Sequence, residues 1–325
     1  MVFPLERPRR LRGSHTLRKM VSETYLSVND LIYPIFIVHG KNIKKEIEPM
    51  PGQFHWSVDR LDEIISEVVK AKISSVILFG IPKVKDTNAS ENYNENGIVQ
   101  QAIREIKKQA PNLVVITDVC LCAYTEEGHC GIYDHYDDIV LNDQTLPILA
   151  KTAVSHARAG ADIVAPSGMI DGMILAMREG LDEAGFVNTA ILSYAVKYAS
   201  AFYGPFRAAC DSSPKGDRKT YQMDYRNAKE ALREASLDEI EGADFLMVKP
   251  ALAYMDIIYR VSQKTNLPMV AYHISGEYAL VKAAAEKGWV NEKDIMLETL
   301  YGLKRAGASL IITYAAIDVA NWLIE

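Results

Sequence analysis

The chain has 325 residues, of which 49% are hydrophobic, and a formal net charge of −6 at pH 7. This composition argues against extensive disorder, and the mildly acidic balance argues against nucleic acid as the main partner. No apolar run is long enough to span a membrane, and the N-terminus lacks the apolar core of a signal peptide, so we expect a cytoplasmic protein without membrane contact.

Residues 1–30 are basic, contain prolines and have weak periodicity. They are consistent with a flexible arm or with an arm that docks on a neighbouring subunit, and the sequence does not decide between the two. We predict that residues 31–325 form a single catalytic domain.

From residue 31 onward, buried strand patterns alternate with helical spacing of apolar residues. The strands are predicted at Leu31–Val38, Ser75–Phe79, Leu113–Val119, Ala161–Pro166, Thr189–Val196, Phe245–Val248, Pro268–His273 and Leu310–Thr313. The helices are predicted around Val58–Val68, Ile98–Lys108, a segment ending near Arg158, Ile170–Glu183, Tyr225–Ile240, Tyr254–Lys264, Glu277–Lys287, Glu292–Lys304 and the C-terminus.

The junctions that lead from a helix into a strand repeat a similar sequence around Gly160, Gly242 and Gly307. Glycine there can take the left-handed conformation that ends a helix before a tight turn. Eight strand–helix units with buried strands predict an α/β fold, the (β/α)8 TIM barrel, preceded by the N-terminal arm. A doubly wound sheet is the alternative, but the segment His39–Asn42 after the first strand lacks its glycine-rich phosphate loop.

Two adjacent predicted strands run into lysines, Lys197 and Lys249. Lysine is rarely buried unless it is used, although a lysine at a strand end can simply reach solvent. In a barrel both would lie on the rim that carries the chemistry, and each would disfavour protonation of the other. A neutral amine can form a Schiff base with a carbonyl. One catalytic lysine with a cationic helper is the alternative.

Three cysteines, Cys120, Cys122 and Cys130, lie in the long loop after the third predicted strand. Three thiolates with an open fourth position describe a reactive zinc site, and soft thiolate ligands favour zinc over magnesium. His129 could be a fourth ligand or could orient a ligand. The alternative is three buried, apolar cysteines.

The loop after the fifth predicted strand carries Arg207 and Arg218 between glycines and prolines. Two arginines on such a loop could clamp a carboxylate as part of a lid, although solvated surface charge is the commoner role of an arginine. Ser275 and Tyr314, at the ends of the seventh and eighth strands, could add hydroxyl contacts.

The segments that carry chemistry are Asp118–Thr125, Gly128–Gly131, Ala165–Ser167, Lys197–Ser200, Phe202–Arg207, Gly216–Lys219, Tyr221–Met223, Met247–Pro250 and Ser275–Tyr278. Together they resemble the porphobilinogen synthase (delta-aminolevulinic acid dehydratase) family, and the likeness covers essentially the whole chain.

The resemblance implies condensation of two 5-aminolevulinate molecules into porphobilinogen in tetrapyrrole (heme) biosynthesis. Lys197 would hold the first substrate and Lys249 the second, each as a Schiff base. The other implied substrate contacts are Arg207, Arg218 and Gln222 to the first carboxylate, Ser275 and Tyr314 to the second carboxylate, Asp118 and Ser167 to the first amino group, and Tyr203 and Phe206 packed over the first substrate.

The resemblance also implies metals and an assembly. Intact Cys120 and Cys122 place the chain in the zinc-type branch, where zinc on the three cysteines acts at the second substrate as a Lewis acid or through bound hydroxide. An allosteric magnesium would map to Glu234, and a homo-octamer with embracing N-terminal arms is usual. Glu127 stands where many zinc-type members have histidine, which affects the hydrogen bonding of the loop and the pH dependence of zinc affinity.

Two other functions compete with this one. The first is a class I Schiff-base aldolase with a single essential lysine. The second is a non-catalytic zinc-binding or interaction protein on a barrel scaffold.

Overall fold

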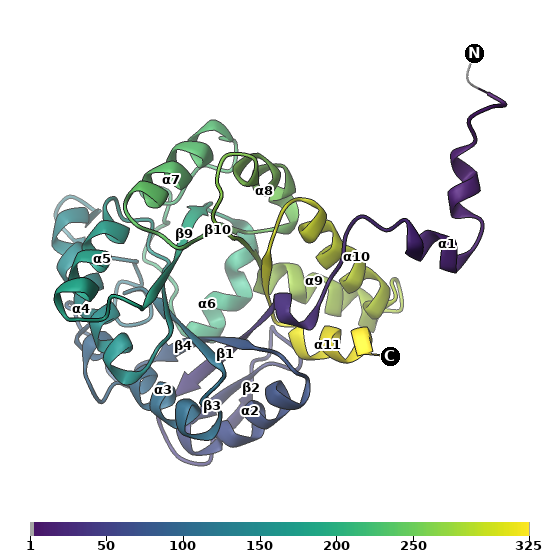
Figure 1. The fold of residues 1–325 in the computed structure, drawn as a ribbon. Coiled ribbons are helices and arrows are strands. Elements are labelled where there is room, and N and C mark those ends of the chain that lie inside the picture. The colour runs from purple at the N-terminus through teal and green to yellow at the C-terminus, as the bar shows by residue number, and fades with distance from the viewer. Residues whose placement is uncertain (1–2, 325) are drawn as a thin grey trace.

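In the computed structural model, which describes residues 3–324, eight parallel strands close into a barrel (Figure 1). Hydrogen bonding follows the order β12-β11-β10-β9-β8-β5-β4-β1, and β12 pairs with β1 to close the ring. The predicted (β/α)8 barrel is therefore confirmed. Its strands are β1 (Leu31–Val38), β4 (Ser75–Ile81), β5 (Val114–Val119), β8 (Ile163–Pro166), β9 (Ala190–Lys197), β10 (Phe245–Lys249), β11 (Met269–His273) and β12 (Leu310–Thr313).

The helices surround the barrel (Figure 1), and apolar residues at helical spacing face its core. In α2, for example, Leu61, Ile64, Ile65 and Val68 are buried at helical spacing, while the acidic residues face outward. The outer helices are α2 (Leu61–Lys70), α3 (Ile98–Gln109), α4 (Asn142–Ala159), α5 (Met173–Glu183), α7 (Lys229–Ile240), α8 (Met255–Ser262), α9 (Ser275–Glu286), α10 (Glu292–Arg305) and α11 (Ala316–Ile324).

The glycines at the repeated junctions have the conformation that the sequence predicts. Gly160, Gly242 and Gly307 have φ angles of 109°, 103° and 115°. A side chain is strained in this region, so glycine lets the helix end and the chain turn directly into the next strand.

Three pieces of regular structure lie in segments where the sequence gives no periodic signal. The first is the β2 (Lys44–Glu46)–β3 (Phe54–Ser57) hairpin, whose β3 extends the sheet beside the end of β1. The second is the β6 (Ile132–Asp134)–β7 (Ile139–Leu141) hairpin within the cysteine loop. The third is α6 (Gly204–Cys210), within the predicted loop after β9. All are too short for an apolar period to develop.

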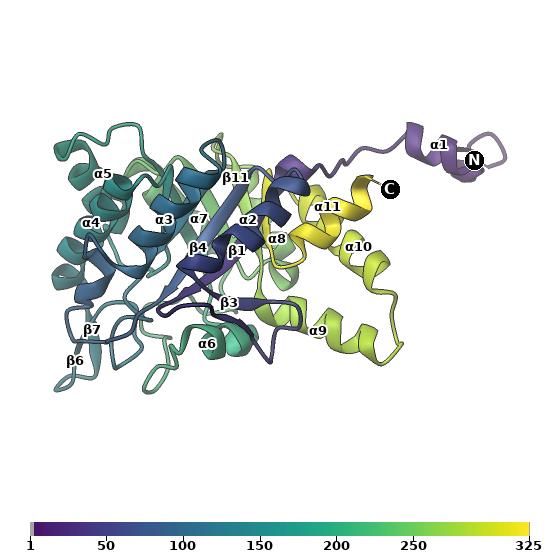
Figure 2. The same cartoon turned by 90° about the horizontal axis from the view of Figure 1, so that it is seen from below.

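These additions gather at one end of the barrel. Figure 2 shows α6 and the β6–β7 hairpin at the same end, which is the end where the barrel strands finish. Functional residues of such barrels lie on the loops at this end. Among residues 3–324, none of the helices is both long and apolar enough to cross a membrane.

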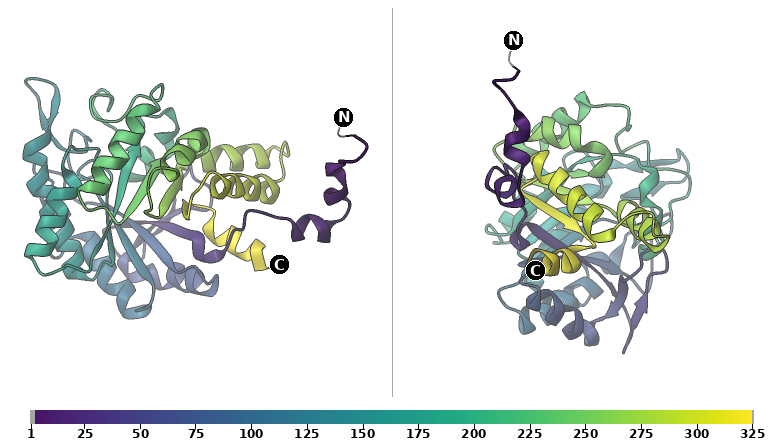
Figure 3. Two further views of the ribbon diagram at one scale, coloured as in Figure 1. Left: turned by 45° about the horizontal axis from the view of Figure 1, so that its top comes forward. Right: turned by 90° about the vertical axis from the view of Figure 1, so that its right-hand side faces the viewer.

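The chain before the barrel extends away from it (Figures 1 and 3). It contains η1 (Pro8–Arg12) and α1 (His15–Met20), neither of which has a buried residue. The short turn η2 (Val28–Asp30) then leads into β1, and Asp30 forms an ion pair of 3.1 Å with Lys304 of α10. The segment therefore has no core of its own.

Candidate active site

Lys197 and Lys249 lie side by side at the end of the barrel. They are the last residues of β9 and β10 and are paired in the register of these two strands. Only 5% of Lys197 and 4% of Lys249 is exposed. The simple alternative, in which these lysines extend into solvent at strand ends, does not describe them.

The Lys249 ammonium lies among aromatic rings. Its Nζ is 4.2 Å from the centroid of the Tyr272 ring, 4.9 Å from Phe206, 5.1 Å from Tyr194 and 5.5 Å from Tyr203. Burial and then the positive charge of Lys197 lower the pKa of Lys249 to about 7, although the Asp118 carboxylate acts in the opposite direction. A large fraction of this amine is therefore neutral, and nucleophilic, near pH 7.

Asp118 and Ser167 lie beside the lysines. The Lys197 amine donates a hydrogen bond to the Ser167 carbonyl oxygen, and the Asp118 carboxyl shares a hydrogen bond with the Ser167 side chain. Burial raises the pKa of Asp118 to about 6, while Lys249 and Lys197 act to lower it. A carboxyl with this pKa can exchange protons near neutral pH.

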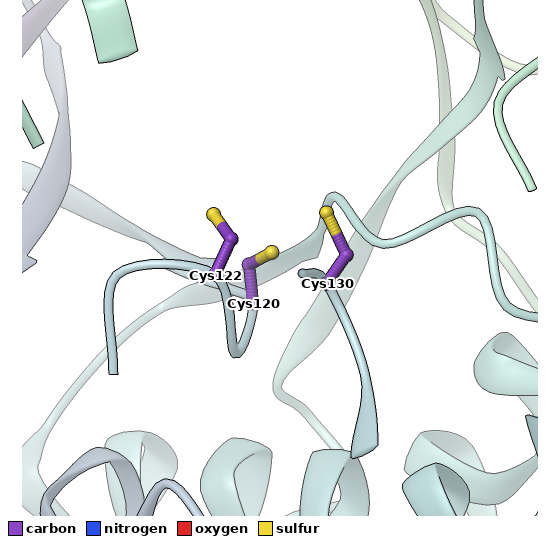
Figure 4. A group of neighbouring side chains, drawn as sticks. All are labelled: Cys120, Cys122 and Cys130. Carbon is purple, nitrogen blue, oxygen red and sulfur yellow. The ribbon is translucent and has the colours of Figure 1, made fainter. Parts of the chain in front are cut away.

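The three predicted zinc ligands form a cluster next to the lysines. The Sγ atoms of Cys120, Cys122 and Cys130 lie within 4.8 Å of one another, and their side chains are buried. Figure 4 shows the three sulfur atoms on the same side of the loop. Among residues 3–324, this is the one set of three His, Cys, Asp or Glu side chains with ligand atoms so close together.

The chemistry of this cluster suits zinc. Tetrahedral zinc with Zn–S bonds of about 2.3 Å places its sulfurs about 3.8 Å apart, a small adjustment from this arrangement. Hydrogen bonds from Cys120 and Cys122, followed by the charge of Arg218, lower the pKa of Cys130 well below its usual value. The cluster thus already favours a thiolate, the form that binds a metal.

His129 contacts the loop after β9, residues 198–224, rather than serving as a ligand beside the cysteines. Its Nδ1 is 3.1 Å from the Tyr221 hydroxyl, and its Nε2 is 2.8 Å from the Lys215 carbonyl oxygen. Both ring nitrogens are therefore engaged, which leaves none for a metal. The buried Glu127 carboxylate lies 3.1 Å from Nε2 of His135, a contact within the cysteine loop itself.

The two predicted arginines differ in their surroundings. Arg218 is buried, and its Nη2 donates to the carbonyl oxygens of Gly128 (2.7 Å) and Ser212 (2.9 Å), which joins the loop after β9 to the cysteine loop. Burial alone lowers the pKa of Arg218, but the thiolates raise it above its usual value. Arg207 is half-buried, and its Nε has no partner.

Gln222 is buried, yet neither its amide oxygen nor its amide nitrogen has a hydrogen-bond partner within the described chain. Buried polar groups are normally satisfied, so an amide in this state indicates a place for a polar ligand.

The remaining predicted contacts, Ser275, Tyr314 and Tyr203, each have a hydrogen-bond partner. Ser275 is the first residue of α9 rather than the end of a strand, because β11 stops at His273, and its Oγ accepts a 3.0 Å hydrogen bond from the Phe206 N–H. The hydroxyl of Tyr314 is 2.9 Å from that of Tyr272. Tyr203 donates to the Tyr198 carbonyl oxygen at 2.8 Å.

Glu234 lies on α7, in a cleft of about 640 Å³ that Tyr221 and Gln222 also line. Burial raises the pKa of Glu234, and it raises the pKa of Asp238 to about 7. Neighbouring carboxylates contribute to both shifts. The acidic residues of this cleft are Asp171, Asp224, Glu230, Glu234, Asp238 and Glu241.

Sequence reasoning missed the tyrosines that surround Lys249 from within the barrel. Tyr194 and Tyr272 are fully buried on β9 and β11. A tyrosine inside an apolar strand is a faint signal, because strands buried on both faces do not reveal which residues face inward. Tyr221, which packs against the three cysteines, carries no separate signal in the sequence either.

Comparison with known proteins gives one consistent family. The model of the family described as "Delta-aminolevulinic acid dehydratase" matches residues 5–322. Delta-aminolevulinic acid dehydratases of Synechocystis sp. and Bacillus subtilis are 58% and 57% identical to the chain, over 99% and 98% of both sequences. The chain is also similar to a crystal structure of delta-aminolevulinic acid dehydratase (porphobilinogen synthase) from Toxoplasma gondii, which was solved in complex with the reaction product porphobilinogen. The two chains are 45% identical in sequence, and their folds superpose with a TM-score of 0.95 over 98% of this chain and 91% of that one.

Proposed function

This chain belongs to the delta-aminolevulinic acid dehydratase family, and we propose that it condenses two 5-aminolevulinate molecules into porphobilinogen through Schiff bases on two lysines. The observation that carries the proposal is the register pairing of Lys197 and Lys249, both buried at the end of the barrel. One barrel end thereby offers two covalent attachment points for two identical ketones. An aldolase needs only one.

Each attachment follows the same chemistry. The neutral lysine amine attacks the ketone carbon, a C–N bond forms, and water leaves after proton transfers. Lys249, with its pKa of about 7, supplies neutral amine at physiological pH. Asp118, with its pKa of about 6, accepts and returns protons beside both lysines.

The first substrate is assigned to Lys197. Arg207, Arg218 and Gln222 bind its carboxylate, which is supported by the unpartnered polar atoms of all three side chains. Asp118 and Ser167 contact its amino group. Tyr203 and Phe206 pack over it.

The second substrate is assigned to Lys249. Ser275 and Tyr314 offer hydroxyls to its carboxylate, on the side of the barrel end where β11 and β12 finish.

The cysteine cluster supports membership of the zinc-type branch. Cys120, Cys122 and Cys130 would hold zinc, which supplies Lewis acidity or a bound hydroxide at the second substrate. Arg218 stabilises the thiolates by charge and joins their loop to the lid. Three thiols suit a reducing compartment, in keeping with a cytoplasmic protein.

Magnesium and assembly complete the proposal. Glu234, in its acidic cleft, is the proposed site of an allosteric Mg²⁺. Residues 1–30 form an arm that docks on a neighbouring subunit of a homo-octamer, and residues 31–325 form the catalytic barrel. The exposed apolar side chains of the arm, including Phe3, Leu5 and Met20, support this docking.

One experiment separates the candidate functions. The protein is incubated with 5-aminolevulinate, porphobilinogen is detected by its colour reaction, and borohydride-trapped adducts are mapped by mass spectrometry. We expect pyrrole formation and adducts on both Lys197 and Lys249. Exposed Lys219 serves as the control for nonspecific adduct formation. An adduct on a single lysine without pyrrole would indicate the aldolase. Neither product would indicate a non-catalytic protein.

A further inference from the structure

Glu277 is a buried carboxylate with no role in the chemistry above. It lies in the first turn of α9, and only 1% of it is exposed. Its Oε1 accepts a hydrogen bond of 2.8 Å from the Leu252 N–H, and its Oε2 accepts one of 2.9 Å from the Ile274 N–H. A buried carboxylate is costly unless such partners satisfy it.

The two amides belong to the starts of two different helices. Leu252 begins the turn η6 (Leu252–Tyr254) that leads into α8, and Ile274 immediately precedes α9. Neither start has a side-chain cap from its own N-cap residue. Glu277 therefore caps two helix starts at once. Burial raises the pKa of its carboxyl to about 7, while the backbone N–H groups of both starts act to lower it.

Each of these helix starts adjoins a residue proposed to hold the second substrate. Lys249 lies three positions before Leu252, and Ser275 directly follows Ile274. The Ser275 Oγ also accepts a hydrogen bond from the Phe206 N–H, which further fixes the segment after β11. The Glu277 side chain thus links the segment after β10 directly to the segment after β11.

We propose that Glu277 is a positioning residue that fixes the separation between Lys249 and Ser275, the amine and the hydroxyl that hold the two ends of the second substrate. The inference rests on the proposed function and adds a residue to it. The partners of Glu277 are backbone N–H donors, and each of its two oxygens accepts from one helix start. The amide of Glu277→Gln has one acceptor oxygen and would direct its NH₂ group at an N–H.

The test compares Glu277→Gln and Glu277→Asp with wild type and with Asn291→Ala. The Asn291 Oδ1 caps α10 by accepting a 3.0 Å hydrogen bond from the Asp294 N–H. The Asn291→Ala variant therefore loses a helix cap that lies away from Lys249 and Ser275. We expect Glu277→Gln to keep the borohydride adduct on Lys197 but to lose about tenfold in the Lys249 adduct and in kcat. Asn291→Ala should lower Tm yet keep both adducts, and Glu277→Asp, which retains a carboxylate, should restore part of the Lys249 adduct.

Other outcomes separate the two proposals. If Glu277→Gln gives both adducts at wild-type levels, the positioning role is overturned while the proposed function stands. If both adducts fall together, or if neither Glu277 variant folds, Glu277 serves stability and the positioning role is again overturned. If wild type itself gives no adduct on either lysine, the proposed function fails, and the positioning role fails with it.

Discussion

Lys249 and Lys197 are paired residues of neighbouring parallel strands, and both amines are buried at the same end of the barrel. Their proximity means that the protonation of one depends on the charge of the other. The pKa of Lys249, about 7, has burial as its first cause and the charge of Lys197 as its second. This second cause can be removed by mutation.

Replacing Lys197 with glutamine should raise the pKa of Lys249. A rise of one unit would cut the fraction of neutral amine at pH 7 about fivefold. The measurement is the pH dependence of reductive methylation of Lys249 by formaldehyde, mapped by mass spectrometry, because formaldehyde needs none of the substrate contacts. Lys282→Gln, which removes a lysine paired with Glu292, serves as the control. A midpoint that stays at about 7 in Lys197→Gln would contradict the coupling.

Zinc removal should abolish activity reversibly. We expect about one zinc per chain in metal analysis of the purified protein, and loss of both zinc and porphobilinogen synthesis after chelation. Cys120→Ser should retain less than about a tenth of the wild-type zinc, because one of three thiolates is lost. Full turnover in zinc-free protein would refute the assignment to the zinc-type branch.

Cys210 provides the matched control for that experiment. It is a free, buried cysteine like the other three, but it does not belong to the three-sulfur cluster. Cys210→Ser should keep its zinc. Equal zinc loss in this variant would mean that buried thiols in general, rather than this cluster, determine metal content.

Magnesium should stabilise the protein through Glu234. Ion binding to the folded state raises Tm, so we expect millimolar Mg²⁺ to raise the wild-type Tm by a few degrees and to have little effect on Glu234→Gln. Glu239→Gln is the control, since Glu239 is on the same helix but lines a different groove, between α7 and α8. A wild-type response in Glu234→Gln would exclude Glu234 as the ligand.

Acid should destabilise the fold through two buried histidines. Burial lowers the pKa of His273 from 6.5 to about 4 and that of His156 to about 3. The unfolded chain therefore binds a proton to each below pH 6.5 while the folded chain does not, so the free energy of unfolding falls as pH drops from 6.5 towards 4. His273 alone should contribute a loss of roughly 3 kcal/mol across this window.

Urea unfolding at a series of pH values measures this dependence. His273→Asn removes the titrating ring and can retain a hydrogen bond to Thr313, the present partner of Nδ1, so its stability should vary less with pH. Replacing exposed His15 with asparagine should leave the wild-type dependence unchanged. An equally steep fall in His273→Asn would assign the acid sensitivity to other groups.

Much of the fold followed from local patterns. The first and last barrel strands, Leu31–Val38 and Leu310–Thr313, have the predicted boundaries, because buried strands are bounded by turn residues in the sequence itself. The hairpin β6–β7 and the helix α6 were not predicted. Their short segments are held in place by tertiary contacts, such as those of α6 with α9 and β4, which no local period records.

Sequence alone thus determined the barrel, the strand ends that carry Lys197 and Lys249, and the identity of the three cysteines, because each depends on residue type and on order along the chain. Tertiary structure decided what surrounds these groups. It placed the rings of Tyr272 and Phe206 around Lys249, engaged both nitrogens of His129, and brought Glu277 onto two helix starts. Charge, burial and hydrogen bonding act through space, and their partners come from residues far apart in the chain.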